Sequence, residues 1–384
     1  MWGDIAIAFV LAFITAYMCT PHTIQLAKKL GAVDSPKDKR RINKVVMPRL
    51  GGLAVICGFF FFFFLFLIVV MSIEKNINLA NGGWYKKIGG FLGGAAIIIA
   101  VCFYDDVYGA KAIFKLLAQI VAATIVVFCG IRIDKIELLS EQLPQWVYML
   151  ITIIWIVGLT NAINLIDGLD GLSTGIAIIS CISLLIVFSL NGSALMSIIL
   201  ITALCGSLCG FLPYNFNPAR TFIGDTGSNF VGFCLSIISI LGVAKTYTAL
   251  IIVAPIIILA LPIFDTACAI LRRLIKGKSI KAVFQPDRGH LHHKMIDAGF
   301  TQKQAVIIMY AVTAMLGLLA VVLMESGFWK ALAFAAVVGI VIALTYKEYF
   351  KQRMIPAHSE NYEIKESRRE EAVIEETSSK KKKK

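Results

Sequence analysis

The 384-residue chain has little charge and few of the residues around which soluble enzymes build their chemistry. Charged residues make up 16% of it, and it has five histidines. None of its nine cysteines forms a C-x-x-C pair, which argues against a disulfide framework or a cysteine-based zinc site, so we interpret them as small buried hydrophobes. The sequence also lacks a serine nucleophile elbow, a catalytic cysteine motif and a glycine-rich loop of the nucleotide-hydrolysing type, which excludes those routes to catalysis.

Hydrophobic residues, by contrast, make up 58% of the chain. They form many runs of the roughly 20 residues that a helix needs to cross a bilayer, so we predict an all-α, polytopic integral membrane protein with about eleven transmembrane helices. The first run, Trp2–Leu26, has no basic segment before it and no small-residue cleavage site, so we expect a retained span rather than a signal peptide. The expected spans are 3–26, 51–72, 88–104, 113–130, 145–160, 172–190, 194–212, 227–243, 247–269, 304–324 and 329–346.

Positive charge is unevenly distributed along the chain. The net charge is +13, but the basic residues gather in two loops, 27–49 and 271–303, and in the tail, without a basic stripe interleaved with aromatics. The tendency of basic loops to face the cytoplasm and the attraction of anionic lipid account for this, so we expect a lipid bilayer and no nucleic acid as partner. Residues 1–348 then form one transmembrane domain, and 349–384 a charged cytoplasmic tail that is expected to be disordered.

The stretch Asn161–Gly171, NAINLIDGLDG, places two amides and two carboxylates between apolar runs. Asn161, Asn164, Asp167 and Asp170 recur every three residues, which keeps neighbouring positions near one face of a helix. Polar groups at membrane depth are costly, so a functional role is the favoured interpretation, and a glycine-capped polar helix end is the alternative. If the two basic loops face the cytoplasm, these residues and the chain's other motif acids and histidines all fall at cytoplasmic ends of spans.

Two further acidic motifs interrupt apolar runs. Asp105–Asp106 closes a span. Adjacent carboxylates that are partly shielded from water repel each other and need a nearby cation, which Lys111 or Lys115 can provide. The alternative is an exposed acid pair in a loop. The run Phe222–Ser228, FIGDTGS, places Asp225 between two glycines ahead of a helix, where N–H groups favour an anion and the carboxylate favours a divalent cation that bridges to phosphate. A plain helix cap has the same pattern.

The run Gln285–Lys294, QPDRGHLHHK, is rich in histidine. A zinc site is disfavoured because His290, His292 and His293 lack the i,i+4 spacing with an intervening acid, and no cysteine lies nearby. Histidine together with Arg288 suits a phosphate or sugar oxygen better. The basic residues of the first loop either bind a substrate phosphate or only mark the cytoplasmic side, and both interpretations stay open.

These residue types together predict a class of chemistry. Oxygen ligands from Asp and Asn suit Mg²⁺, with Mn²⁺ as an alternative, and magnesium prefers few protein ligands plus substrate phosphates. Lysine, arginine and histidine stabilise phosphate charge. We therefore predict phosphoryl-type transfer on a membrane-bound substrate at the cytosolic face. A lipid or solute transporter that uses the same acids as a path, and a scaffold without activity, are the alternatives.

The chain resembles the polyprenyl-phosphate N-acetylhexosamine-1-phosphate transferases of bacterial envelopes. Four motifs match in order, Asp105–Asp106, NAINLIDGLDG, FIGDTGS and DRGHLHH, and the hydrophobic layout matches over about residues 1–346. The GHLHH form is similar to the branch that takes UDP-GlcNAc, whereas the muramoyl-pentapeptide branch usually has three consecutive histidines. The resemblance implies transfer of GlcNAc-1-phosphate from UDP-GlcNAc to undecaprenyl phosphate, giving undecaprenyl-diphospho-GlcNAc and UMP.

The resemblance implies a setting as well. The enzyme would lie in the bacterial plasma membrane with its site facing the cytoplasm, as a homodimer, and would start an envelope glycan such as teichoic acid, capsule or O-antigen. Another UDP-N-acetylhexosamine, such as UDP-MurNAc-pentapeptide, is the alternative donor.

The resemblance further implies roles for individual residues. Magnesium would lie between Asn164 and Asp225, Lys115 would contact phosphate, and Gly168 and Asp170 fall where the family meets uracil. A histidine common in the first loop of the family is Asn43 here, so that position is assigned no role. The substrate-binding set is completed by Asn161, Asp167, Arg288, His290, His292 and His293.

A phosphate monoester has a second pKa near 6, so the lipid phosphate is mostly dianionic at neutral pH and needs alignment and charge neutralisation more than a strong base. We hypothesise that Asp105 or Asp106 nevertheless takes a proton. The alternative is that this acid pair positions Lys115 and the metal.

Overall fold

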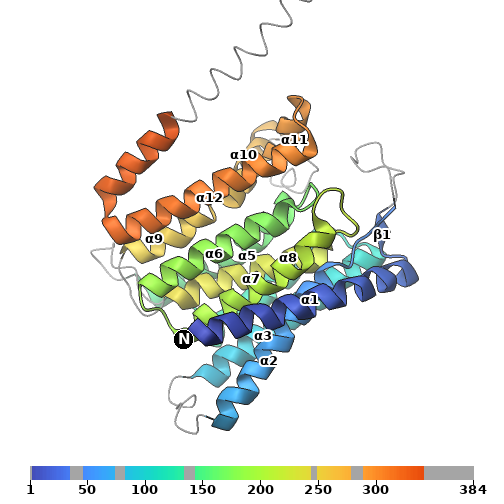
Figure 1. Ribbon diagram of the computed structural model, residues 1–384, viewed down its shortest axis with the longest axis horizontal. Coiled ribbons are helices and arrows are strands. Elements are labelled where there is room, and N and C mark those ends of the chain that lie inside the picture. The colour runs from blue at the N-terminus through green and yellow to red at the C-terminus, as the bar shows by residue number, and fades with distance from the viewer. Residues whose placement is uncertain are drawn as a thin grey trace, which may run out of the picture. The chain divides into compact units, whose positions relative to one another are not determined.

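The computed structural model describes residues 2–34, 46–73, 83–133, 143–243, 249–277 and 289–340. Within these ranges the chain is helical almost throughout, which confirms the predicted all-α class (Figure 1). One short antiparallel pair occurs there, between β1 (Val33–Asp34) and β2 (Met47–Pro48). The helices of the first compact unit, in chain order, are α1 Trp2–Leu30, α2 Gly52–Ile73, α3 Trp84–Tyr108, α4 Ala112–Phe128, α5 Gln145–Ile166, α6 Leu172–Leu190, α7 Leu195–Asn215, α8 Gly224–Val243, α9 Ala249–Ile258, α10 Ala260–Gly277, α11 Leu291–Asp297 and α12 Gln302–Ser326.

The composition of these helices supports a polytopic membrane protein. Among the described residues, seven helices are long and apolar enough to cross a membrane, namely α1, α3, α5, α6, α7, α8 and α12. Large apolar side chains on outer helices, such as Met18, Phe114 and Phe264, are 64%, 58% and 70% exposed, as expected of a surface that faces lipid. The total of eleven spans stays a prediction.

One expected span, 247–269, is not a single helix. It divides at Leu259 into α9 and α10, and α10 continues to Gly277. The break has a chemical cause: Pro262 lacks the N–H that would bind the carbonyl of Ile258, and its ring crowds that carbonyl. The second half therefore becomes a separate helix, which carries Asp265.

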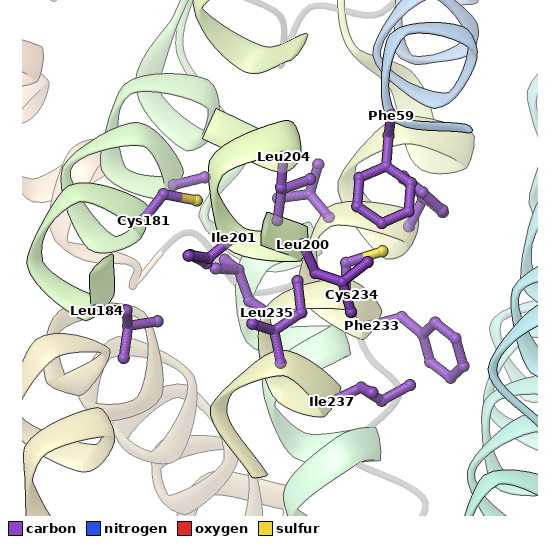
Figure 2. Close-up of a cluster of buried hydrophobic side chains, with 14 of the residues drawn as sticks. Phe59, Cys181, Leu184, Leu200, Ile201, Leu204, Phe233, Cys234, Leu235 and Ile237 are labelled. Atoms are coloured by element: carbon purple, nitrogen blue, oxygen red, sulfur yellow. The ribbon is translucent and has the colours of Figure 1, made fainter. Parts of the chain in front are cut away.

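The core centres on α8, which packs against α2, α3, α5, α6, α7 and α9. Its side chains from Phe230 to Leu241 are all buried, and Leu235 lies among Leu200 of α7, Leu184 of α6 and their neighbours (Figure 2). In Figure 1, α1 lies beside α7, and α6 lies between α7 and α12. This apolar packing fixes α8 and hence the location of its first turn.

Cysteines take part in this core. Cys181 and Cys234 are buried there as free thiols (Figure 2), as the sequence predicted, and Cys102 and Cys205 are buried too. Sulfur in such surroundings behaves as a small apolar group. Four other cysteines are half-buried and Cys57 is exposed, so the prediction of buried thiols is wrong for Cys57, whose helix turns that side chain outward.

Contacts divide the chain into two compact units, Met1–Gly327 and Phe328–Lys384. In the second unit, Phe328–Ile340 forms an apolar helix. The predicted domain boundary at residue 348 and the tail 349–384 lie outside the described residues, so both stay predictions.

Candidate active site

Four helix ends meet in the first unit, and each brings a polar side chain of the predicted motifs. Asp105 and Asp106 lie in the last turn of α3, Lys115 in the first turn of α4, Asn164 in the last turn of α5, and Asp225 in the first turn of α8. We call Asp105, Asp106, Lys115 and Asp225 the carboxylate cluster.

Asp225 is the centre of the carboxylate cluster. Lys115 Nζ lies 2.8 Å from Asp225 Oδ2 and 2.8 Å from Asp105 Oδ2, so one ammonium group bridges the acids of α3 and α8. Asn164 Nδ2 donates to Asp225 Oδ1 at 2.9 Å and to Ser228 Oγ at 2.9 Å. The structure therefore brings together Asn164 and Asp225, the pair to which the resemblance assigns magnesium.

Asp106 is used differently from Asp105. It is buried, and its carboxylate accepts hydrogen bonds from Asp225 N at 3.0 Å, Thr226 N at 2.8 Å and Thr226 Oγ1 at 2.6 Å. The first N–H groups of a helix have no partner inside it, and a negative charge there also meets the positive end of the helix dipole. Asp106 therefore caps α8 and fixes Asp225, whereas Asp105 faces the ammonium group of Lys115.

Arg49 also reaches the cluster, although sequence reasoning left its role open between phosphate binding and topology. Its Nη2 lies 3.7 Å from Asp106 Oδ1 and 3.9 Å from Asp225 Oδ2, and its side chain is 32% exposed. The cluster thus has a second cation on its accessible side.

Backbone contacts hold Arg49 in this position. Phe222 N donates to Pro48 O at 2.8 Å, and Gly52 N donates to Ile223 O at 2.9 Å, so the chain on both sides of Arg49 is docked beside the start of α8. Gly224 has a φ of +69°, and a Cβ there would collide with the carbonyl oxygen of Arg49. A glycine before Asp225 is therefore required by close backbone approach.

Asn161 belongs to an amide network beside the cluster. Its Nδ2 donates to Gln119 Oε1 of α4, and Gln119 Nε2 donates to Asn229 Oδ1 of α8 at 2.7 Å. Asn229 Nδ2 in turn donates to Asp225 O at 2.8 Å. Asn161 therefore helps to tie three helices together. Sequence reasoning missed Gln119, for which an amide inside an apolar helix was the available sign.

The predicted single face for four polar residues is right for Asn161 and Asn164 and wrong for Asp167 and Asp170. Helix α5 ends at Ile166, so Asp167 follows its last residue and Asp170 lies in the turn before α6. The glycines of the motif end the helix, so Asp167 and Asp170 do not continue its polar face.

The two acids of this turn have different surroundings. Asp170 is buried and accepts hydrogen bonds from Asn217 Nδ2 at 3.0 Å and Ala219 N at 3.1 Å, so it holds the loop before α8. Asp167 accepts one from Ser173 Oγ at 2.6 Å. Burial raises the pKa of Asp167 to about 7, the Ser173 bond opposes that rise, and the charge of Asp225 adds to it. Both forms of Asp167 are therefore populated near neutral pH.

The histidine motif forms a second polar group, which we call the histidine cluster: Asp265, His290, His292 and His293. Asp265 Oδ2 lies 2.8 Å from His290 Nδ1, and Asp265 Oδ1 accepts Leu291 N–H at 2.9 Å. The rings of His290 and His292 are nearly parallel, with centroids 5.8 Å apart. The ring centroids of His292 and His293 are 4.3 Å apart.

This cluster contacts the turn after α5. A Cβ on Gly168 would collide with the ring of His292, so the two motifs touch at a residue without a side chain. Burial, reinforced by His293 and His290, lowers the pKa of His292 to about 3, so this ring is neutral at working pH. Arg288 and Asn43 lie outside the described residues, so the expectation for Arg288 stays a prediction.

The residues around Asp225 fit a divalent cation that keeps most of its ligands from elsewhere. Among the described residues, no group of three or more His, Cys, Asp or Glu side chains is arranged to hold a metal alone. Three carboxylates nevertheless share two cationic side chains, which leaves surplus negative charge. Asp225, Ser228 and the amide oxygen of Asn164 are hard donors, and magnesium binds by few such groups plus phosphates. The Asn164 amide presents its nitrogen to Asp225, so it would have to turn over to offer oxygen.

Comparison with known proteins shows the family of the chain. The glycosyl transferase family 4 profile matches residues 88–243. A probable undecaprenyl-phosphate N-acetylglucosaminyl 1-phosphate transferase of Bacillus subtilis (strain 168) is 38% identical over 332 residues, which are 85% of this chain and 87% of that protein. The chain belongs to glycosyl transferase family 4.

Two other relatives of this family 4 member show the range of the likeness. A decaprenyl-phosphate N-acetylglucosaminephosphotransferase of Mycobacterium tuberculosis (strain ATCC 25618 / H37Rv) is 29% identical over 80% of this chain and 79% of its own length. A phospho-N-acetylmuramoyl-pentapeptide-transferase of Chlamydia trachomatis (serovar L2) is 34% identical over 30% of this chain and 35% of its own length. The family match includes the whole carboxylate cluster and ends before the histidine cluster.

Proposed function

We propose that this family 4 transferase moves GlcNAc-1-phosphate from UDP-GlcNAc to undecaprenyl phosphate, with release of UMP. The observation that carries the proposal is the convergence of Lys115, Asn164 and Asp225 from three helices, with contacts of 2.8 to 2.9 Å. Positioned cations and oxygen ligands are what phosphoryl transfer needs, since its catalysis is mostly alignment and charge stabilisation. The names of the Bacillus and Mycobacterium relatives support the same sugar phosphate and a polyprenyl phosphate acceptor.

The residues of the cluster divide the work. An oxygen of the lipid phosphate attacks the β-phosphorus of UDP-GlcNAc, and the bond from that phosphorus to the bridging oxygen breaks, so UMP leaves with the electron pair. Lys115 and Arg49 neutralise phosphate charge, and Asp106 keeps Asp225 at the start of α8. Asp105 orients Lys115 at 2.8 Å, and we keep it as the acid of the pair that can take a proton.

Magnesium is part of this proposal. Asn164 and Asp225 would hold the ion, and its charge would stabilise the diphosphate and the departing UMP. The surplus of carboxylates over cations around Asp225 is the feature of the chain that supports it.

We place the site at the cytoplasmic face of a bacterial plasma membrane. Lys28 and Lys29 occupy the last turn of α1, directly before the β1–β2 segment that leads to Arg49. Basic residues beside a span favour the cytoplasmic side, so the carboxylate cluster and the basic end of α1 share that side. A homodimer stays an expectation from the resemblance, and the mass of the detergent-solubilised protein tests it.

The test is UMP release by the purified chain in lipid nanodiscs. We expect release to require UDP-GlcNAc, undecaprenyl phosphate and Mg²⁺ together, and to stop when a chelator removes the metal. Absence of UMP with every UDP-N-acetylhexosamine and polyprenyl phosphate tried would overturn the proposal and favour a transporter.

The same chemistry on UDP-MurNAc-pentapeptide is the second candidate, supported by the partial match to the Chlamydia relative. A panel of UDP-GlcNAc, UDP-GalNAc and UDP-MurNAc-pentapeptide at equal concentration separates the donors. The one with the highest kcat/KM is the substrate.

A further inference from the structure

The histidine cluster contains one acid, Asp265, to which the proposed function assigns no role. Asp265 lies in the second turn of α10 and is 6% exposed. A buried carboxylate is costly unless its oxygens are bound, and both are: Oδ2 meets His290 Nδ1 at 2.8 Å and Oδ1 accepts Leu291 N–H at 2.9 Å. One acid on α10 therefore grips two consecutive residues where α11 begins.

The bond to Oδ2 fixes the tautomer of His290. A carboxylate only accepts hydrogen bonds, so His290 must carry a proton on Nδ1, and Nε2 is the ring nitrogen left for another partner. A partner on one ring nitrogen commonly sets the tautomer and orientation of a histidine in this way. The bond to Leu291 N–H also fixes the start of α11 on α10.

The orientation of the His290 ring influences His292 because the two rings pack against each other. The rings of His290 and His292 lie 12° from parallel, and His292 is 2% exposed. Among the described residues, His292 Nδ1 is buried without a hydrogen-bond partner, so packing rather than hydrogen bonding sets this ring. The ring rests on Gly168, which follows Asp167. Asp167 N donates to the carbonyl oxygen of Asn164 at 3.3 Å, and the side chain of Asn164 donates to Asp225. Contacts therefore run from Asp265 to the turn beside the carboxylate cluster.

We propose that Asp265 is a positioning residue of the transferase. Asp265 holds His290 and α11 so that the histidine cluster stays packed against the Asp167–Gly168 turn and binds the nucleotide-sugar donor. This rests on the proposed function. Asp265 acts through His290 and does not touch the substrate. Its loss therefore weakens donor binding while the phosphate-handling residues stay in place.

The first experiment is a double-mutant cycle with Asp265→Asn, His290→Asn and the pair. Carboxylates that orient histidines at metal sites are worth about 10- to 100-fold in affinity or activity, so we expect Asp265→Asn to raise KM for UDP-GlcNAc about tenfold. We expect kcat and KM for undecaprenyl phosphate to change less than about twofold, and the double variant to match His290→Asn alone, because residues that act as a unit are not additive. The matched control is Asp297→Asn, an exposed acid on α11.

The second experiment reads the tautomer directly. The chain has five histidines, so selective ¹⁵N labelling gives few signals, and His290→Asn assigns the one of interest. We expect the Nδ1–H form in the unmodified protein and its loss in Asp265→Leu, which has a similar size but no acceptor. Should that variant not fold, Asp265→Glu, which keeps the charge but displaces it, takes its place.

The outcomes separate the two proposals. An unchanged tautomer, or additive losses in the cycle, overturns the role of Asp265. A roughly tenfold fall in kcat of Asp265→Asn, with the KM values for both substrates unchanged, also overturns it. If the unmodified chain releases no UMP, the proposed function fails, whereas the tautomer result still reports whether Asp265 orients His290.

Discussion

The carboxylate cluster and the histidine cluster use acids in opposite ways. In the first, the three carboxylates share Lys115 and Arg49, and Asp225 alone has partners from α4, α5 and the segment before α2. In the second, Asp265 binds a ring and an N–H of two adjacent residues. The first has surplus negative charge, which a divalent cation can neutralise. In the second, both oxygens of Asp265 already have hydrogen-bond partners, so this acid positions its neighbours. Substitutions should therefore affect kcat in one cluster and KM for the donor in the other.

The strongest test of this contrast is Asp225→Asn. The isosteric amide removes the charge that Lys115, Arg49 and the proposed metal share, so we expect kcat to fall roughly 100- to 1,000-fold with little change in folding. UMP release under saturating substrates measures it. The control is Asp4→Asn, an exposed acid in the first turn of α1. Retention of more than about half of the activity would show that the carboxylate cluster is structural.

Arg49→Gln is expected to have the next largest effect. A charge-assisted contact is worth about 1.5–3 kcal/mol, so kcat/KM should fall roughly 10- to 100-fold. Arg49→Lys, which keeps the charge, should recover part of it. Lys29→Gln, at an exposed basic position on α1, is the matched control and should behave as the unmodified protein. Equal behaviour of Arg49→Gln and the Lys29 control would limit Arg49 to marking the cytoplasmic side.

Gly168→Ala tests the contact between the two clusters. The added methyl group meets the His292 ring, and overpacking of this kind costs about 1–3 kcal/mol, so we expect KM for UDP-GlcNAc to rise about tenfold with kcat nearly unchanged. Gly158→Ala, where a Cβ would meet open space on α5, is the control. A fall in kcat without a change in KM would contradict the division of labour between the clusters.

Asp167 lies between the clusters, and its titration should give the smallest effect. Burial raises the pKa of this carboxyl to about 7, so it is mostly protonated below pH 7 and mostly ionised above it. If the ionised form accepts a hydrogen bond from the donor, kcat/KM for UDP-GlcNAc rises through pH 7, and Asp167→Asn lacks this rise.

The expected loss in Asp167→Asn is about fivefold at pH 8 and negligible at pH 6, the size of one net hydrogen bond. The lipid phosphate titrates near pH 6 in both proteins and serves as the internal control. A rise through pH 7 that persists in Asp167→Asn would assign the titration to another group.

Much of the site follows from the sequence because of topology. Topology predicts that the motif acids, such as Asp105 and Asp225, share one side, because polar residues at the ends of apolar spans fall on one side when the spans alternate in direction. Hydrophobic run lengths and loop charge determine that alternation, and both are local properties of the chain. The all-α class follows for the same reason. The pairing of Asn164 with Asp225 and the role of Lys115 were expected from the family resemblance.

Other parts of the site depend on which helices are neighbours and how each is rotated. Gln119 meets Asn161 and Asn229 only because α4 and α8 both pack against α5. The same holds for Asp265 with His290, and for Arg49, whose position depends on backbone bonds to the chain before α8. A nearly uniform apolar sequence leaves helix rotation undetermined, since few polar positions mark a buried face.

The sequence by itself determined that this chain is a helical membrane protein with acids, amides and histidines gathered at one end of its spans, because burial of apolar runs and loop charge act residue by residue. Only the tertiary structure decided that Asp106 caps α8 while Asp105 faces Lys115, and that Asp265 grips the start of α11. Those roles depend on hydrogen bonds and ion pairs over distances of about 3 Å between residues far apart in the chain, which form only once the helices are packed.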